Sequence, residues 1–284
     1  MKPSRPTILP PIRSNAGTTA LYRKKLIRLI AEMHESVLYW LSASYKANEP
    51  VIAQDELPAE ALRRAVQQLS RRWQKQFDEA APKLAKYFAK AANQRSARQL
   101  QRILAEAGFS VEFKMTRAMQ DVMKASVNEQ VSLIRSIPQK YFADVQGAVM
   151  RSVSAGRDLE SLVKEIGPKV DLKRINQGRK PGEAQKSYAA RTARRAAFIA
   201  RDQNNKMTAV FTRVRQQEAG ISRAIWVHSG GGKEPRPSHV AAGRRKQEYD
   251  VTEGWYDPDV EKHIFPGELP NCRCVSRAVI TGFS

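Results

Sequence analysis

Cysteine is rare in this sequence, since its 284 residues include only two, Cys272 and Cys274. Two cysteines exclude the disulfide framework that holds many small secreted domains together. A single residue separates the two thiols, and a disulfide across that gap would be badly strained. The sequence therefore predicts reduced thiols in a cytoplasmic protein.

Long apolar runs are also missing. The most apolar stretch, Leu26–Leu41, is interrupted by Arg28, Glu32 and Glu35, so we expect no membrane-spanning helix. Residues 1–15 are rich in proline and lack the apolar segment of a signal peptide. The sequence also lacks a Walker loop, a dinucleotide-binding fingerprint and a paired-carboxylate motif. We therefore expect neither a membrane protein nor an enzyme of those classes.

Acidic residues are few beside basic ones. The chain has 28 Asp and Glu against 49 Lys and Arg, for a formal net charge of +21. The excess precedes residue 222, because residues 222–284 hold 9 basic and 8 acidic side chains. Such an excess attracts polyanions: nucleic acid, an anionic membrane surface or an acidic protein. The alternative interpretation is that these charges lie on solvated helix faces.

Apolar residues recur at helical spacing through most of the first 220 residues. The first helix is expected over 19–46, with its apolar stripe at Tyr22, Leu26, Leu29, Met33, Val37 and Trp40. Pro82 is expected to interrupt the second helix, and Pro138 to begin a new helix after one that ends at Ile134. Strands are expected at 222–228 and 272–280. The pattern predicts an α+β fold: a mainly α-helical N-terminal and central region followed by a small mixed α/β C-terminal module containing Cys and His.

The composition divides the chain into four regions. They are an extended, Pro-rich basic arm (1–18), an N-terminal helical region (19–107), a basic helical region (108–220) and the C-terminal module (221–284). The arm has no core of its own, so it either hangs free or lies along a partner.

Residues 173–215 form the most basic segment, with 12 Lys and Arg against two acidic side chains. A helix of this composition is suited to contact the phosphate backbone of nucleic acid without sequence preference. Alternatively, its apolar stripe packs inward and its charges face water. The candidate contact residues are Arg191, Arg194, Arg195, Arg201, Lys206, Arg213 and Arg215.

The same helix contains a polar cluster, Asp202-Gln-Asn-Asn205. Asp and Asn are poor residues for a helix interior. Either the module that follows satisfies these side chains, or they form an exposed polar turn; the exposed turn is the simpler interpretation.

The last 57 residues contain both cysteines and three of the four histidines. Cys272 and Cys274 are two residues apart, so on a strand both thiols would face the same side. Together with His239, and with His228 or His263 as a fourth ligand, they match the donor set of a structural zinc site. A module of about 60 residues buries only a small core, so a metal would contribute much of its stability.

Two other interpretations of this cluster stay open. The thiols are small buried hydrophobes in one, with the histidines bonded to loops. In the other, the cluster is catalytic: His239 is the general base of a metal-dependent nuclease, or Cys272 is a nucleophile paired with His239. Ser238 is a candidate cap for a short helix that carries His239.

Several short motifs occur in a specific order over the last third of the chain. They are Ile199-Ala-Arg-Asp-Gln-Asn-Asn205, Trp226, Arg236-Pro-Ser-His239, Pro266-Gly267 and Asn271-Cys-Arg-Cys274. In this order and spacing, residues 190–279 resemble the phage Mu protein F family, the minor head proteins of tailed bacteriophages. The sequence departs from the family pattern at Gly230–Glu234 and at Ala241–Gly243, where many members carry acidic residues. His239, Cys272 and Cys274 are unaffected by these departures.

The resemblance implies a structural role in head morphogenesis. The implied partners are the phage portal protein and the scaffold or capsid proteins, with double-stranded DNA as a nonspecific contact. The implied location is the interior or portal vertex of the virion head, and the host cytoplasm during assembly. A metal-dependent nuclease acting in DNA packaging or ejection is the alternative function.

Overall fold

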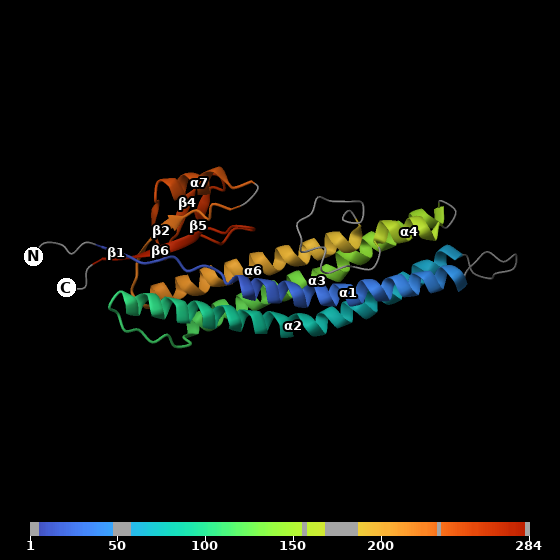
Figure 1. The fold of residues 1–284 in the computed structure, drawn as a ribbon, viewed down its shortest axis with the longest axis horizontal. Helices are drawn as coiled ribbons and strands as arrows, with labels where there is room; N and C mark the ends of the chain where they lie inside the picture. The colour runs from blue at the N-terminus through green and yellow to red at the C-terminus, as the bar shows by residue number, and fades with distance from the viewer. Residues whose placement is uncertain (1–5, 48–57, 155–157, 168–186, 232–233, 282–284) are drawn as a thin grey trace, which may run out of the picture. The chain divides into compact units, whose positions relative to one another are not determined.

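The computed structural model describes residues 6–47, 58–154, 158–167, 187–231 and 234–281. Within these residues the chain forms long helices followed by a small module with antiparallel strands, so the predicted α+β class is confirmed (Figure 1). The helices are α1 (Ala16–Ala47), α2 (Pro58–Glu106), α3 (Arg117–Ser154), α4 (Leu159–Ile166), α6 (Tyr188–Glu218) and α7 (Pro237–Arg244). The strands are β1 (Thr7–Ile8), β2 (Arg223–Val227), β3 (Glu248–Asp250), β4 (Trp255–Asp257), β5 (Lys262–Ile264) and β6 (Val275–Ile280).

Residues 1–5 of the predicted arm and residues 173–186 of the predicted basic segment lie outside the described residues. Among the helices that are described, none has the length and apolar character needed to cross a bilayer.

The chain divides into two compact units, each assembled from separate segments. The first unit contains residues 1–20, 86–128 and 200–284, and the second contains residues 21–85 and 129–199. The compact units thus draw on segments from several of the regions that the sequence predicted.

The second unit is a helical core in which α1 buries one stripe of side chains. Tyr22, Leu26, Met33 and Val37 are buried as the spacing predicted, whereas Trp40 is 46% exposed. Leu41 takes the expected place of Trp40, four residues and about one helical turn after Val37.

The prediction that prolines divide the helices is wrong. Pro82 lies inside the continuous helix α2, and Pro138 lies inside the continuous helix α3. A proline costs one backbone hydrogen bond and some strain. Buried side chains on both sides of each proline, such as Phe77 and Phe88 in α2, hold the two halves of the helix in one continuous element.

The first unit contains a four-stranded sheet with the order β1-β6-β2-β3, whose strand pairs are antiparallel, and a separate pair, β4 and β5. The first strand of the chain lies beside the last one (Figure 1), with Thr7 opposite Ile280. Leu9 and Ile12 of the arm are buried. The described part of the arm therefore packs against its own chain and does not hang free.

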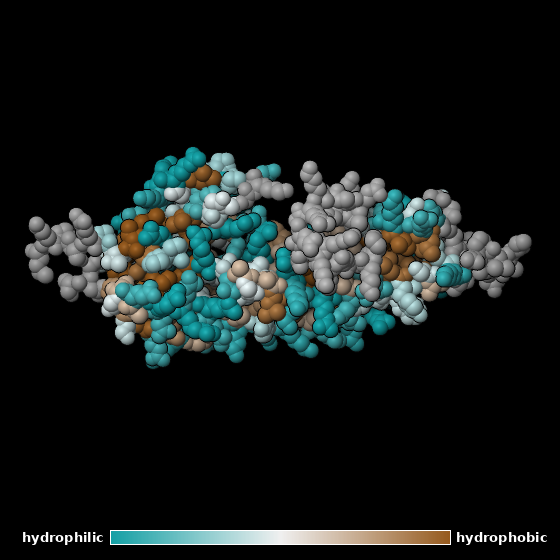
Figure 2. Space-filling model, in the orientation of Figure 1, coloured by the Kyte–Doolittle hydropathy of each residue, from teal (hydrophilic) through white to brown (hydrophobic). Residues whose placement is uncertain are grey.

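The core of the C-terminal module lies between this sheet, α7 and the β4–β5 pair. Its buried side chains are Ala224, Trp226, Ala242, Tyr249, Val251, Ile264, Leu269, Cys272 and Cys274. On the face shown in Figure 2, hydrophobic residues gather over the sheet, whereas the nearby helices show mainly hydrophilic residues. The two cysteines thus belong to the interior of the module.

Candidate metal centre

The three predicted donor residues reach the interior of the module from two elements. His239 lies in the first turn of α7, and Cys272 and Cys274 lie in the segment before β6. Pro237 occupies the first turn of α7, where its missing N–H costs nothing. The expected cap from Ser238 is wrong: Asp259 instead accepts the backbone N–H of Ser238 at 3.1 Å.

The prediction that both thiols lie on a strand is also wrong, because β6 begins at Val275. The pairing of β6 with β2 starts at Val275, which lies opposite Val227, and does not extend back to the cysteines. The thiols converge through the preceding loop. The Nδ1 atom of His239 lies 3.5 Å from the Sγ atom of Cys272 and 3.8 Å from that of Cys274. One donor atom from each of the three residues lies within 4.8 Å of the other two, and all three residues are buried.

These distances suit a tetrahedral metal site. Zinc binds thiolate at about 2.3 Å and imidazole at about 2.0 Å, so a sulfur and a nitrogen ligand would be about 3.5 Å apart. The observed separations of 3.5 and 3.8 Å are close to that value. The buried His239, Cys272 and Cys274 group therefore has the donor chemistry and the spacing to hold a metal ion.

The other nitrogen of His239 faces a carboxylate. Nε2 lies 3.3 Å from Oδ2 of Asp257, although the alignment falls short of a hydrogen bond. Asp257 at the end of β4 is fully buried. A carboxylate behind a metal-binding imidazole fixes its orientation and strengthens it as a ligand. Asp257 was not predicted as a site residue, because a single Asp before Pro258 carries no local signal of a metal site.

Aromatic side chains pack beside the imidazole of His239. The ring of Trp226 is fully buried and meets His239 edge-on, with ring centroids 4.9 Å apart. Trp255 packs against Trp226 in turn, at 5.2 Å. The cluster thus lies in apolar surroundings that exclude water and strengthen electrostatic interactions.

The pKa values of the two thiols shift in opposite directions, so that Cys272 loses its proton more readily than Cys274. The hydrogen bond from Cys274, aided by His239 and by the backbone N–H of Gly267, lowers the pKa of Cys272. The same interaction with Cys272, with burial, raises the pKa of Cys274. A thiolate at Cys272 is the form that binds metals.

The structure does not bring the other two histidines to this cluster. His228 accepts the backbone N–H of Gly230 through Nδ1, at 3.2 Å. His263 in β5 lies against Tyr256, with Nδ1 3.4 Å from the carbonyl oxygen of Gly254. Among the described residues, the donor set therefore consists of His239, Cys272 and Cys274.

The polar cluster of α6 anchors the cysteine loop. Asp202 accepts the backbone N–H of Asn271 at 2.5 Å, and Arg201 donates to Oδ1 of Asn271 at 3.1 Å. Asp202, Gln203 and Asn204 are buried, so the expected exposed turn is wrong and the following module satisfies part of the cluster.

Gly267 allows the loop to approach α6 closely. Its φ of +83° favours glycine, and a Cβ atom there would lie 2.8 Å from Cβ of Ala209. Its backbone N–H points at Sγ of Cys272, at 3.4 Å. Glycine at this position therefore serves both the contact with α6 and the placement of the thiol.

The predicted nucleic-acid residues of α6 are mostly engaged within the chain. Arg215 is buried and donates to Ser96 Oγ at 2.9 Å and to the carbonyl oxygen of Asn93 at 3.2 Å. Burial lowers the pKa of Arg215 to about 10. The guanidinium of Arg213 stacks 3.6 Å from the ring centroid of Phe265, and burial lowers its pKa. At these two positions the guanidinium groups contact other parts of the chain, Arg215 in the core and the half-buried Arg213 on the ring of Phe265.

The remaining candidates are more accessible. Arg191 pairs with Asp144 at 3.2 Å, and Arg195 donates to Ser136 at 3.0 Å. Arg194 is exposed, whereas Lys206 and Arg201, which donates to Asn271, are half-buried. Contact of these five side chains with nucleic acid stays a prediction.

Comparison with known proteins gives one relative and no family. A stretch of 153 residues, 53% of the chain, is 31% identical to an uncharacterized protein of Haemophilus influenzae. The match spans 28% of that protein, so the chain corresponds to a little more than a quarter of its relative's length. No family model and no solved structure matches the chain.

Proposed function

We propose that this protein is a structural head protein of a tailed bacteriophage or prophage, and that its C-terminal module is held together by a zinc ion on His239, Cys272 and Cys274. Its partners in this proposal are the portal protein and the scaffold or capsid proteins. It acts at the portal vertex inside the head, and it assembles there from the host cytoplasm.

One observation carries the proposal: the motifs behind the resemblance to phage Mu protein F are joined in space. Asp202 of α6 binds the backbone of Asn271, and Gly267 packs against α6. The thiols that follow face His239, which packs against Trp226. Motifs that are tens of residues apart along the chain therefore lie together in the fold.

The burial of the cluster favours a structural metal over a catalytic one. His239, Cys272 and Cys274 are each no more than 4% exposed. A bound zinc ion would tie α7 to the loop before β6 and add its binding free energy to folding. The carboxylate of Asp257 lies behind the imidazole, 3.3 Å from Nε2 of His239.

Particle composition tests the proposal. Phage particles released from the host that carries this gene should contain the full chain, detected by mass spectrometry of density-purified particles. Deletion of the gene should leave few normal heads in electron micrographs. Normal particles without the protein would overturn the structural role.

The nuclease alternative has its own readout. Plasmid DNA incubated with the full chain and magnesium, manganese or zinc should stay intact. Cleavage that disappears in His239→Ala, while His263→Ala still cleaves, would replace the structural role with the nuclease function.

A further inference from the structure

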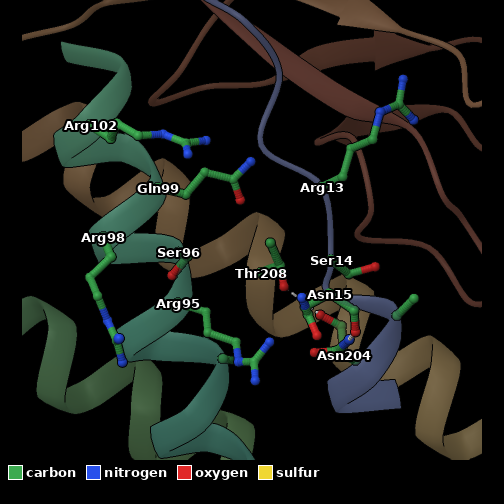
Figure 3. A pocket seen from close by; sticks show the side chains of 12 residues that line it. Arg13, Ser14, Asn15, Arg95, Ser96, Arg98, Gln99, Arg102, Asn204 and Thr208 are labelled. Atoms are coloured by element: carbon green, nitrogen blue, oxygen red, sulfur yellow. Dashed lines mark hydrogen bonds between the residues drawn. The ribbon is translucent and has the colours of Figure 1, made fainter. Parts of the chain in front are cut away.

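A cavity in the first unit, apart from the metal centre, is lined by basic side chains. It lies between the arm, α2 and α6, with a volume of about 620 Å³. Its lining includes four arginines and no acidic residue: Arg13, Arg95, Arg98 and Arg102. Figure 3 shows Arg95, Gln99 and Arg102 extending from α2 into the space in front of the arm, with Arg98 along α2 and Arg13 turned toward the sheet.

The floor of the cavity is polar and fixed. Asn204 of α6 is 1% exposed and donates to the carbonyl oxygen of Asn15 at 3.0 Å and to Thr19 at 2.8 Å. Ser96 is buried and accepts from Arg215 at 2.9 Å. Asn15 accepts the backbone N–H of Thr18 at 2.9 Å and so caps α1, whose first turn lies at the cavity. A rigid floor spares a ligand the entropy cost of ordering the site.

Within the part of the chain that the structure describes, the four arginines form a single ion pair, and that pair is exposed. Arg102 lies 3.7 Å from Glu106, but both side chains are more than half exposed, and such a pair contributes little. The exposed guanidinium groups present forked donors that match phosphate oxygens. The first turn of α1 adds a weak positive potential in the same place.

The spacing of the arginines points to a chain of phosphates. Arg95 and Arg102 are seven residues apart on α2, which corresponds to about 10 Å along the helix axis. One strand of DNA carries about three phosphates over that axial length. A single inorganic phosphate would reach only part of the row.

We propose that this cavity, which we name the arginine cavity, binds successive backbone phosphates of nucleic acid through Arg95, Arg102 and Gln99, with Arg98 and Arg13 at its edges. The site differs from the predicted one on α6, where Arg213 and Arg215 are engaged in the core. The proposal stands whether or not the protein is part of a phage head, because it depends only on the chemistry of the cavity.

Fluorescence anisotropy of the full chain with a labelled random-sequence DNA duplex of about 20 bp tests the site, at about 50 and about 200 mM salt. The double variant Arg95→Gln/Arg102→Gln should weaken binding at least about tenfold at the lower salt. It should also reduce the slope of log K against log salt by about 2, since each lost phosphate contact contributes about 0.9. The matched control, Arg63→Gln/Arg72→Gln, removes the same charge from exposed positions of α2 outside the cavity, and should stay within about twofold of the wild type.

A second pair of variants keeps the arginines. Gln99→Glu places a negative charge in the cavity and should weaken binding, whereas Gln101→Glu on the same helix, outside the cavity lining, should have a smaller effect. Unchanged helical circular dichroism in each variant confirms the fold. Equal losses in the cavity and control variants would overturn the proposal, because net charge alone would then explain binding.

Calorimetry with inorganic phosphate distinguishes the source of the phosphate. Weak or no binding of the free ion is expected. Tight binding of inorganic phosphate that is lost in Arg95→Gln/Arg102→Gln, with DNA affinity unchanged, would overturn the assignment to nucleic acid.

Discussion

The carboxylate of Asp202 in the middle of α6 accepts the backbone N–H of Asn271, 69 residues further along the chain, at 2.5 Å. Asn271 has a φ of +62°, in the left-handed region, and directly precedes Cys272. One buried helical side chain therefore fixes the backbone turn from which the thiols emerge. This contact connects the helical part of the first unit to the candidate metal centre.

Replacement of this carboxylate should loosen the module. Asp202→Ala leaves the N–H of Asn271 without its acceptor, and we expect a loss of about 1–3 kcal/mol in the free energy of unfolding. Asp202→Asn keeps an acceptor oxygen and should lose less. Urea unfolding followed by tryptophan fluorescence measures both. Equal stability of Asp202→Ala and the wild type would show that the contact does not anchor the loop.

The two thiols should be needed for the fold of the module. Cys272→Ser and Cys274→Ser each remove a thiolate ligand and should unfold the C-terminal module, because much of its stability would come from the metal. The expected signs are a lost near-UV circular dichroism signal and a lower melting temperature. His263→Ala serves as a control, since His263 lies outside the donor group and should leave both signals intact. An intact spectrum and unchanged melting in both cysteine variants would remove the claim.

Asp257 should set the metal affinity without binding the metal. Asp257→Asn removes the charge 3.3 Å from Nε2 of His239, and we expect a loss of about 10–100-fold in zinc affinity. Competition with a coloured chelator measures the affinity. Asp259→Asn is the matched control, because Asp259 caps α7 through Ser238 and does not face the imidazole. The same affinity in Asp257→Asn and wild type would exclude a role for the carboxylate.

Features of the fold that depend on neighbouring residues could be predicted from the sequence, whereas features that depend on contacts between distant residues could not. The stripe of Tyr22, Leu26, Met33 and Val37 was predictable because helical period is a local property. The continuity of α2 through Pro82 was not, because packing on both sides of the proline decides it.

In the candidate site, too, the residue types could be predicted and their long-range placement could not. The donor chemistry of His239, Cys272 and Cys274 was predictable from the rarity and grouping of these residue types. Their approach through a loop was not, because the pairing of β6 with β2 sets where that strand begins. Neither Asp257 behind His239 nor Asp202 at Asn271 has a local signal that identifies its partner.

Acid should weaken a contact in the second unit. Burial raises the pKa of Glu165, but hydrogen bonds from Tyr188 and Arg151 outweigh it and leave the pKa below its ordinary value of 4.5. A lowered carboxylate pKa contributes stability above the ordinary value, and this contribution is lost as pH falls through the folded-state value. Between about pH 5 and about pH 3 the wild type should therefore lose more unfolding free energy than Glu165→Gln. Parallel losses in the two proteins would show that the contact contributes nothing.

The ligand shell of the metal tests the account most directly. X-ray absorption at the zinc edge, on the 284-residue chain purified without added metal and then loaded with one equivalent of zinc, reports the atoms that bind the ion. We expect two sulfur atoms at about 2.3 Å and nitrogen at about 2.0 Å, with the sulfur signal lost in Cys272→Ser/Cys274→Ser. A shell of oxygen and nitrogen alone, or a protein that does not retain zinc, would contradict the proposed metal centre.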